Sequence, residues 1–335
     1  MRSKFLLVAV GLALLVASLV GVTSSRTSAA PSAAPGSAAA ALQNDFVSVY
    51  RKVAPSVVQI QTSEGLGSGV VLDRNGNIVT NAHVVGSAKT FTVTTSTGKR
   101  LRATLVGLFT PDDLAVIKVT SSANLRPAVL ADSSKLRVGD IAMAIGNPLG
   151  LRSSVTQGIV SALNRAPSEG GAAVLRNAIQ TSAPINPGNS GGALADVRGR
   201  VIGIPTLAAV DAQLGGAAAG IGFAIPSNTV RDIAGQIVRN GKVVNSRRAY
   251  LGVEIGDTGN GVYVGTVTAG GPAAKAGLVP GDVILAVAGK PTLSSDELGS
   301  VLATLRPGQT VKVRIARQNG TTATLDVELG EYPGG

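Results

Sequence analysis

Short apolar runs, many of them rich in β-branched residues, alternate with glycine and polar residues from Val53 to about Ile225. Runs of this length predict short strands, and the dipeptide Asn75-Gly76 between two of them predicts a tight hairpin. We expect the strands at residues 57–62, 69–72, 78–80, 91–95, 101–108, 114–119, 141–145, 155–163, 201–205 and 222–225. So many short strands predict a mainly β fold, either a sandwich or barrels.

A helix follows these strands. Ser227 is a suitable N-cap residue, the apolar positions after it have helical spacing, and Asn240-Gly241 is a stop signal. We therefore place a domain boundary near Asn245 and predict a first domain over residues 44–245.

The last part of the chain, residues 246–335, has a different pattern. Its predicted strands are 262–267, 283–287, 311–316 and 322–329. The sequence Ser294-Ser295-Asp296-Glu297 has the pattern of a capping box and predicts the start of a helix. This part is therefore predicted to be a small α+β domain.

The N-terminus has the organisation of an export signal. Arg2 and Lys4 precede an uninterrupted apolar run over residues 5–22, and Ser28-Ala29-Ala30 offers a cleavage site of small residues. A helix of 18 residues is about 27 Å long, which also suits an uncleaved membrane anchor. We expect residues 1–43 to be a signal peptide or membrane anchor followed by an Ala/Ser/Pro-rich linker, and the protein to be periplasmic, on the cell surface or secreted.

The composition excludes several kinds of site. The 335 residues include no cysteine and one histidine, which removes disulfides, thiolate nucleophiles, zinc fingers and multi-histidine metal sites. Since the sequence also lacks a P-loop, we expect no metal and no cofactor.

The net charge is +11, but no aromatic residues are interleaved with its densest basic cluster, Lys99, Arg100 and Arg102. We interpret the charge as solvated surface and expect no nucleic-acid partner.

The segment Gly188-Asn189-Ser190-Gly191-Gly192 is the most informative in the chain. Glycines on both sides of one serine allow a tight turn that points backbone amides at one spot, as an oxyanion site requires. Taken alone, the segment is also compatible with an ordinary glycine-rich turn. The nucleophile elbow of α/β-hydrolases is excluded, because there a histidine follows the serine, whereas the single histidine here, His83, precedes it.

The order of His83, Asp113 and Ser190 along the chain is more informative than each residue alone. A lone histidine such as His83 is more often structural, and an aspartate before a strand, such as Asp113, is an ordinary turn residue. The order His83, Asp113, Ser190 on a mainly β chain is, however, that of chymotrypsin-type proteases. A subtilisin-type order through Asp73 is the alternative, but Asp73 is better explained by the hairpin, and the helices of that fold are absent from the pattern.

Several motifs strengthen this interpretation. They are Gly67-Ser68-Gly69-Val70, Thr80-Asn81-Ala82-His83-Val84-Val85, Asp113-Leu114-Ala115-Val116, Gly146-Asn147-Pro148, Gln180-Thr181, Ile185-Asn186-Pro187-Gly188-Asn189-Ser190-Gly191-Gly192 and Gly222-Phe223-Ala224-Ile225-Pro226. With them, residues 44–330 resemble the trypsin-like serine proteases of the HtrA/Deg group that carry one C-terminal PDZ domain. The resemblance implies a chymotrypsin-like double β-barrel with the triad in the cleft between the barrels, followed by a small α+β PDZ domain.

The resemblance also implies a role for each residue of the site. Ser190 would be the nucleophile, His83 the general base and Asp113 the group that orients the imidazole. Asp112 is the rival for the third role. The backbone amides of Gly188 and Ser190 would form the oxyanion hole.

For the substrate, the resemblance implies a small apolar pocket walled by Pro184, Ile185 and Ile204, and cleavage after Val, Ala or similar residues. Ser182 and Pro205 depart from the family pattern near the cleft, where aspartate and asparagine are expected.

In the last domain, Tyr250-Leu251-Gly252-Val253 resembles the carboxylate-binding loop of PDZ domains, which implies apolar C-terminal peptides as partners. The resemblance further suggests a homotrimer, with Phe46 and Tyr50 as candidate contacts.

Together these observations predict an exported serine endopeptidase that degrades unfolded or damaged proteins without a cofactor. A chaperone-like or scaffold protein that binds misfolded chains with little turnover is the alternative function.

Overall fold

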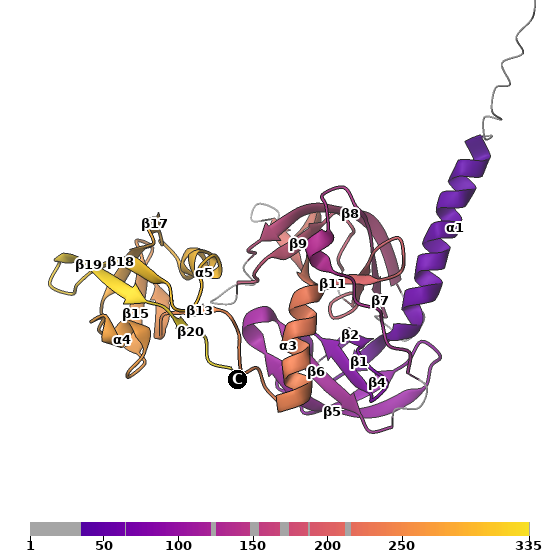
Figure 1. Cartoon of the computed structure of the whole chain (residues 1–335), viewed down its shortest axis with the longest axis horizontal. Helices are drawn as coiled ribbons and strands as arrows, with labels where there is room; N and C mark the ends of the chain where they lie inside the picture. Colours follow the sequence, from indigo (N-terminus) through magenta and orange to yellow (C-terminus); the bar gives the residue numbers. More distant parts are fainter. Residues whose placement is uncertain are drawn as a thin grey trace, which may run out of the picture. The chain divides into compact units, whose positions relative to one another are not determined.

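The computed structural model describes residues 35–63, 65–121, 125–147, 154–167, 174–186, 188–211 and 216–334 (Figure 1). The predicted apolar run at 5–22 and the cleavage site at 28–30 lie outside these residues. None of the described helices combines the length and the apolar character needed to cross a membrane. Residues from Leu42 onward belong to one compact unit.

Helix α1 (Pro35–Val53) begins inside the predicted linker. Its first turns contain the run 38–41 of four alanines, which have the highest helix propensity of all residues. Near its end, Val49 and Val53 are buried, and Phe46 and Tyr50 pack partly buried against the same core. These two aromatic residues therefore contact their own chain.

The first six strands form a closed barrel in the order β1-β2-β3-β6-β5-β4, and all neighbours are antiparallel. The strands are β1 (Val57–Gln61), β2 (Leu66–Val71), β3 (Asn77–Thr80), β4 (Thr90–Thr94), β5 (Arg100–Phe109) and β6 (Leu114–Val119). The predicted hairpin joins β2 to β3, with Gly76 at a φ of +89°. Asp73 stabilises this turn, because its carboxylate accepts hydrogen bonds from the backbone N–H groups of Asn75 and Asn77.

The next six strands form a second closed barrel in the order β10-β11-β12-β9-β8-β7. They are β7 (Ile141–Gly146), β8 (Ser154–Arg165), β9 (Ala178–Thr181), β10 (Ala193–Ala195), β11 (Val201–Asp211) and β12 (Gly216–Pro226). The sequence prediction missed β9 and β10, which are short and, unlike the predicted short strand at 78–80, have no hairpin signal such as Asn-Gly beside them. The prediction of a mainly β fold is confirmed, and barrels rather than a sandwich are present.

Helix α3 (Ser227–Asn240) packs against a core cluster that contains residues of both barrels. Its residues Val230, Ile233 and Ile237 are buried there, and Gly241 ends the helix in the left-handed conformation, as predicted. The predicted N-cap is wrong: Pro226 occupies that position. The Ser227 hydroxyl instead donates to the carbonyl of Ala131, so tertiary contacts hold the start of the helix.

The last domain has its own hydrophobic core. Its elements are β13 (Ala249–Tyr250), β14 (Val253–Asp257), β15 (Val262–Val267), α4 (Pro272–Lys275), β16 (Val283–Val287), β17 (Lys290–Pro291), α5 (Ser295–Ala303), β18 (Thr310–Ala316), β19 (Thr322–Glu328) and β20 (Gly330–Glu331). The predicted helix start is confirmed: Ser294 is the N-cap, and its hydroxyl accepts a hydrogen bond from Glu297 N–H. The Glu297 carboxylate reaches back to Leu293 N–H, one residue before the N-cap of a regular capping box. The domain is thus of the predicted α+β type.

Two adjacent residues of α3 test how much this helix contributes to stability. Ile237 is fully buried, whereas the Val238 side chain is 36% exposed. We expect Ile237→Ala to lower the free energy of unfolding by about 2–5 kcal/mol, because it removes buried methyl groups and leaves a cavity. Val238→Ala is the control and should change it by about 0.5 kcal/mol or less. Urea denaturation measures both, and equal effects would show that the helix does not depend on this face.

Candidate active site

His83 lies on the short helix α2 (Ala82–Val85), directly after strand β3. Its backbone N–H donates to Asp113 Oδ1 at 3.0 Å, and its ring Nδ1 lies 2.9 Å from Asp113 Oδ2. Asn81 adds a hydrogen bond from its side-chain amide to the Asp113 carbonyl at 3.0 Å. Because one carboxylate bonds both the backbone and the ring of His83, the position and the rotation of the imidazole are fixed together.

Asp113 and Asp112 are adjacent carboxylates with different partners. The short 3₁₀ helix Thr110–Asp112 ends at Asp113, which adopts the left-handed conformation with a φ of +47°. This conformation is uncommon outside glycine but is tolerated by aspartate. Both side chains are nearly fully buried, yet only Asp113 is bonded to His83.

Asp112 forms a buried ion cluster with two arginines. Its Oδ1 accepts a hydrogen bond from Arg248 Nη1 at 2.5 Å, and its Oδ2 lies 3.6 Å from Arg176 Nη2. Arg248 also donates to the carbonyls of Pro111 and Val174. Burial lowers the pKa of the Arg176 guanidinium below its usual range, and the negative charge of Asp112 opposes this shift. Asp112 is therefore engaged away from His83.

Ser190 and Asp113 are linked through Thr206, on strand β11. The Ser190 hydroxyl donates to the Thr206 carbonyl at 3.0 Å, and the Thr206 hydroxyl donates to Asp113 Oδ2 at 2.5 Å. Sequence reasoning missed Thr206. The only signal in the sequence is that a polar residue directly follows the apolar run Val201–Pro205. In the structure, the Thr206 side chain is buried.

The backbone amides around Ser190 differ in whether they have an acceptor within the described residues. The N–H groups of Asn189, Gly191 and Gly192 donate to backbone carbonyls. Among the described residues, neither Gly188 N–H nor Ser190 N–H has such an acceptor. These are the two amides that the sequence analysis assigned to an oxyanion hole.

The glycines of this loop are required by space. A Cβ atom built on Gly191, whose φ is +79°, would lie 2.2 Å from the carbonyl oxygen of Ser68. A Cβ atom on Gly192 would lie 2.5 Å from the carbonyl oxygen of Ile145. The loop therefore approaches strands of both barrels at backbone distance.

The three residues predicted to wall the substrate pocket do not share one cluster. Pro184 is exposed, and its carbonyl accepts a hydrogen bond from the Thr156 hydroxyl. Ile185 is buried in the core of the second barrel and lies against Gly222. Ile204 is fully buried in the core cluster shared by the two barrels and α3.

The two departures from the family pattern have backbone roles. The Ser182 hydroxyl accepts a hydrogen bond from Ile159 N–H at 3.0 Å. The carbonyl of Pro205 accepts one from Gly191 N–H at 3.0 Å, one residue after Ser190. Pro205 therefore supports the serine loop through its carbonyl group, which proline retains.

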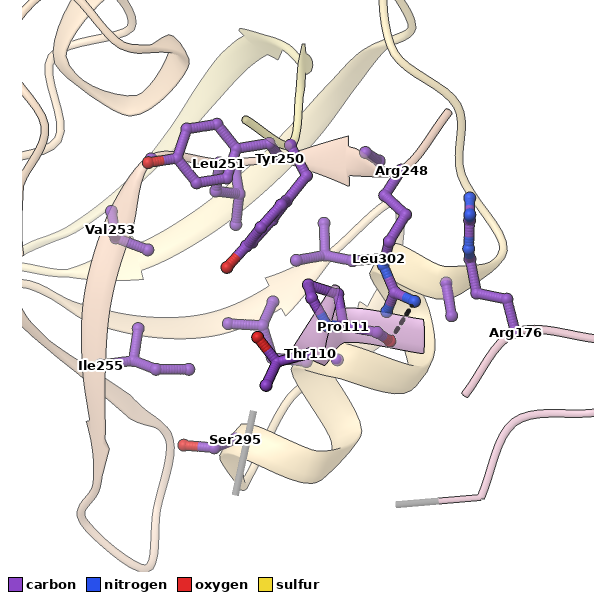
Figure 2. Close-up of a pocket in the computed structure, with 16 residues that line it drawn as sticks. Thr110, Pro111, Arg176, Arg248, Tyr250, Leu251, Val253, Ile255, Ser295 and Leu302 are labelled. Atoms are coloured by element: carbon purple, nitrogen blue, oxygen red, sulfur yellow. Dashed lines mark hydrogen bonds between the residues drawn. The ribbon is translucent and has the colours of Figure 1, made fainter. Parts of the chain in front are cut away.

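A pocket of about 270 Å³ lies between the predicted carboxylate-binding loop and helix α5 (Figure 2). Tyr250-Leu251-Gly252-Val253 lines one side, and Ser295 and Leu302 of α5 line another. Gly252 has a φ of +80°, which glycine adopts at no steric cost. Thr110 and Pro111 also line the pocket, and Figure 2 shows the hydrogen bond from Arg248 to the Pro111 carbonyl.

Comparison with known proteins agrees with this architecture. Residues 67–204 match the trypsin-like peptidase domain, and residues 249–329 match the PDZ domain. The chain is 41% identical over 281 residues to the periplasmic pH-dependent serine endoprotease DegQ of Escherichia coli. The matched region spans 80% of this chain and 60% of DegQ. It is 34% identical to the serine endoprotease DegS of the same organism over 97% of each chain.

Among solved structures, the HtrA-type protease AlgW with a decapeptide matches with a TM-score of 0.59 and 33% identity, over 86% of this chain and 99% of that one. The double barrel, the following PDZ domain and the identity to DegS along nearly the whole chain agree with one another. This chain therefore belongs to the HtrA family of trypsin-like serine proteases that carry a PDZ domain after the protease domain.

Proposed function

We propose that this chain is an extracytoplasmic serine endopeptidase that hydrolyses unfolded or damaged proteins with Ser190, His83 and Asp113 as its catalytic triad. The observation that carries the proposal is the buried Asp113 carboxylate, which is bonded to the ring and backbone of His83 and, through Thr206, is linked to Ser190. The name of the relative DegQ supports the location, and the export-like N-terminus agrees with it.

The chemistry follows from these contacts. With Nδ1 donating its proton to Asp113, the other ring nitrogen of His83 is the basic one. The Ser190 hydroxyl turns from the Thr206 carbonyl towards that nitrogen, transfers its proton to it and attacks the substrate carbonyl carbon. The protonated imidazole then gives the proton to the leaving amine. In the second half of the reaction, His83 takes a proton from water, the water attacks the acyl carbon, and His83 returns the proton to Ser190.

The negative oxygen of the tetrahedral intermediate would lie between Gly188 N–H and Ser190 N–H. One such donor is worth roughly 3–4 kcal/mol of transition-state stabilisation. Because both donors belong to the backbone, the conformation of the loop determines their direction.

For the substrate we keep a small apolar primary pocket at Pro184, Ile185 and Ile204 as the proposal. A Cβ atom on Gly222 would collide with the Ile185 side chain, so any pocket at this position is small. A pocket narrowed in this way favours Val or Ala over a long basic side chain.

For the PDZ domain we propose the capture of apolar C-terminal peptides by Tyr250-Leu251-Gly252-Val253. The pocket beside this loop is lined mainly by apolar side chains of β14 and α5, such as Val253 and Leu298, which suits a peptide with apolar residues at its end. The relative AlgW was solved with a decapeptide, which is consistent with peptide binding in this family.

A homotrimer completes the proposal, together with residues 5–22 as either a cleaved signal peptide or an uncleaved membrane anchor. Phe46 and Tyr50 contact the core of their own chain, whereas Leu42 and Val47 of α1 are 47% and 37% exposed. Phe46 and Tyr50 are only partly buried and remain the candidate trimer contacts, with the exposed Leu42 and Val47 beside them on α1.

The first experiment compares the protein with Ser190→Ala on unfolded casein at neutral pH. The substitution removes the nucleophile, so we expect a loss in kcat of about 10⁶-fold, to below detection. Gel analysis and release of peptide fragments measure the rate. Binding of casein without cleavage by either protein would favour the chaperone-like function, and cleavage that survives the substitution would exclude Ser190 as the nucleophile.

The two adjacent aspartates provide a matched pair. Asp113→Asn should lower kcat by about 10⁴-fold, because the amide favours the wrong histidine tautomer. Asp112→Asn should instead lower stability by about 3–5 kcal/mol, since it leaves Arg248 and Arg176 without their buried counter-charge. Steady-state kinetics and thermal unfolding of both variants separate the two effects. The opposite pattern would reassign the third triad role to Asp112.

The PDZ proposal is tested with one peptide in two forms. A peptide that ends in valine with a free carboxylate should bind at least about tenfold more tightly than its amidated form, because the charged terminus forms the stronger hydrogen bonds. Fluorescence anisotropy with Ser190→Ala protein, which cannot cleave the probe by the proposed mechanism, measures both affinities. Equal affinities would contradict carboxylate recognition at this loop.

A further inference from the structure

We propose that the hydroxyl of Ser68 is a positioning group for the oxyanion hole: it holds the peptide unit between Gly188 and Asn189 in the one orientation that leaves the Gly188 and Ser190 amides facing the substrate. Ser68 belongs to strand β2 of the first barrel, far from Ser190 in the sequence. The proposal rests on the proposed serine-protease function and adds to it a residue outside the triad.

The hydroxyl of Ser68 makes two hydrogen bonds. It donates to the carbonyl oxygen of Gly188 at 2.5 Å and accepts a hydrogen bond from the N–H of Asn147 at 2.8 Å. Ser68 is fully buried, so water cannot replace either contact at the protein surface. A side chain without a hydroxyl group would leave the Gly188 carbonyl without this donor.

The same peptide unit is held at its other polar end. The N–H of Asn189 donates to the carbonyl of Asn186 at 3.0 Å, while the carbonyl of Gly188 bonds to Ser68. A peptide unit is planar, so bonds at both ends fix its rotation. Gly188 needs this restraint, because its φ of +99° lies in a region where only glycine moves freely.

The backbone N–H and carbonyl of Ser68 hydrogen-bond to Ser190 and to Thr80. Its N–H donates to the Ser190 carbonyl at 2.9 Å, and its carbonyl accepts a hydrogen bond from the Thr80 hydroxyl at 2.6 Å. Thr80 ends strand β3, three residues before His83. Ser68 thus contacts the serine loop of the second barrel and the strand that leads to the histidine of the first.

These contacts predict a specific kinetic effect. An oxyanion hole acts only when its donors point at the position of the developing charge. A small rotation of the peptide unit between Gly188 and Asn189 moves the adjoining amides of Gly188 and Ser190. It therefore weakens binding of the transition state more than binding of the substrate. Loss of the Ser68 hydroxyl should therefore lower kcat by about 10–100-fold, less than deletion of a donor, and leave KM nearly unchanged.

The experiment compares Ser68→Ala with a matched control, Ser227→Ala. Ser227 is also a fully buried serine of the protease domain, and its hydroxyl also donates to a backbone carbonyl, that of Ala131 at 2.9 Å. Both substitutions remove a buried hydroxyl that donates to a backbone carbonyl, but only that of Ser68 contacts the serine loop. Ser68→Ala also removes the acceptor of the Asn147 N–H. Thermal unfolding measures the stability of each variant. The values of kcat and KM are measured with a peptide substrate that has valine directly before the bond to be cleaved.

A second readout isolates the oxyanion. A peptide aldehyde adds the Ser190 hydroxyl to form a tetrahedral hemiacetal, whereas the corresponding peptide alcohol cannot form this adduct. We expect Ser68→Ala to weaken binding of the aldehyde by about the same factor as kcat and to leave binding of the alcohol unchanged. Ser227→Ala should change neither ratio.

Three outcomes would overturn the proposal: an unchanged kcat in Ser68→Ala, an equal loss in binding of the aldehyde and the alcohol, or the same kinetic defect in Ser227→Ala. Should Ser68→Ala fail to fold, Ser68→Cys decides, because a thiol is a weaker donor of similar size; an undiminished kcat would again refute the role. Failure of the proposed function is distinct, since the unsubstituted protein would then show neither Ser190-dependent cleavage nor preference for the aldehyde.

Discussion

The contact on which the site depends is the one that holds the Asp113 carboxylate in place. This nearly buried group accepts hydrogen bonds from the backbone and ring of His83 and from the hydroxyl of Thr206. A buried carboxylate is costly unless it is bonded, and charge-assisted bonds of this kind are among the strongest that side chains form. Because His83 follows a strand of the first barrel and Thr206 belongs to the second, the same carboxylate also joins the barrels at the site.

The spacing between the barrels at this point is set by glycine. A Cβ atom on Gly191 would lie 2.2 Å from the carbonyl oxygen of Ser68 in the first barrel. Within the second barrel, a Cβ atom on Gly146 would lie 2.7 Å from the Gly188 carbonyl oxygen. These distances are shorter than any Cβ contact can be, so the backbones meet directly and larger residues would force them apart. The glycines around Ser190 therefore serve close approach, and hydrogen bonds, such as those of Ser68, restrain the freedom that glycine would otherwise allow.

Much of this could be predicted from the sequence, because the strands show β periodicity and the order of His83, Asp113 and Ser190 is distinctive. Residue types alone do not separate Asp112 from Asp113, and the sequence favours Asp113 only through the motif that places the acid directly before Leu114-Ala115. The different partners of the two carboxylates follow from the left-handed conformation at Asp113, which the sequence does not reveal. Ser68 and Thr206 lie outside the predicted triad because a hydroxyl in or beside an apolar strand has no evident partner until two barrels are packed together.

The short turn Thr110–Asp112 contacts both the pocket beside residues 250–253 and the surroundings of His83. Thr110 and Pro111 line the pocket beside the PDZ loop, while the next residues provide the ion pair with Arg248 and the bonds to His83. A buried ion pair of this kind contributes little net stability, because desolvation offsets most of the attraction, but removing one partner is costly. The cluster is therefore better understood as a constraint on position: it holds the turn against Arg248, and the covalent chain carries that constraint to Asp113.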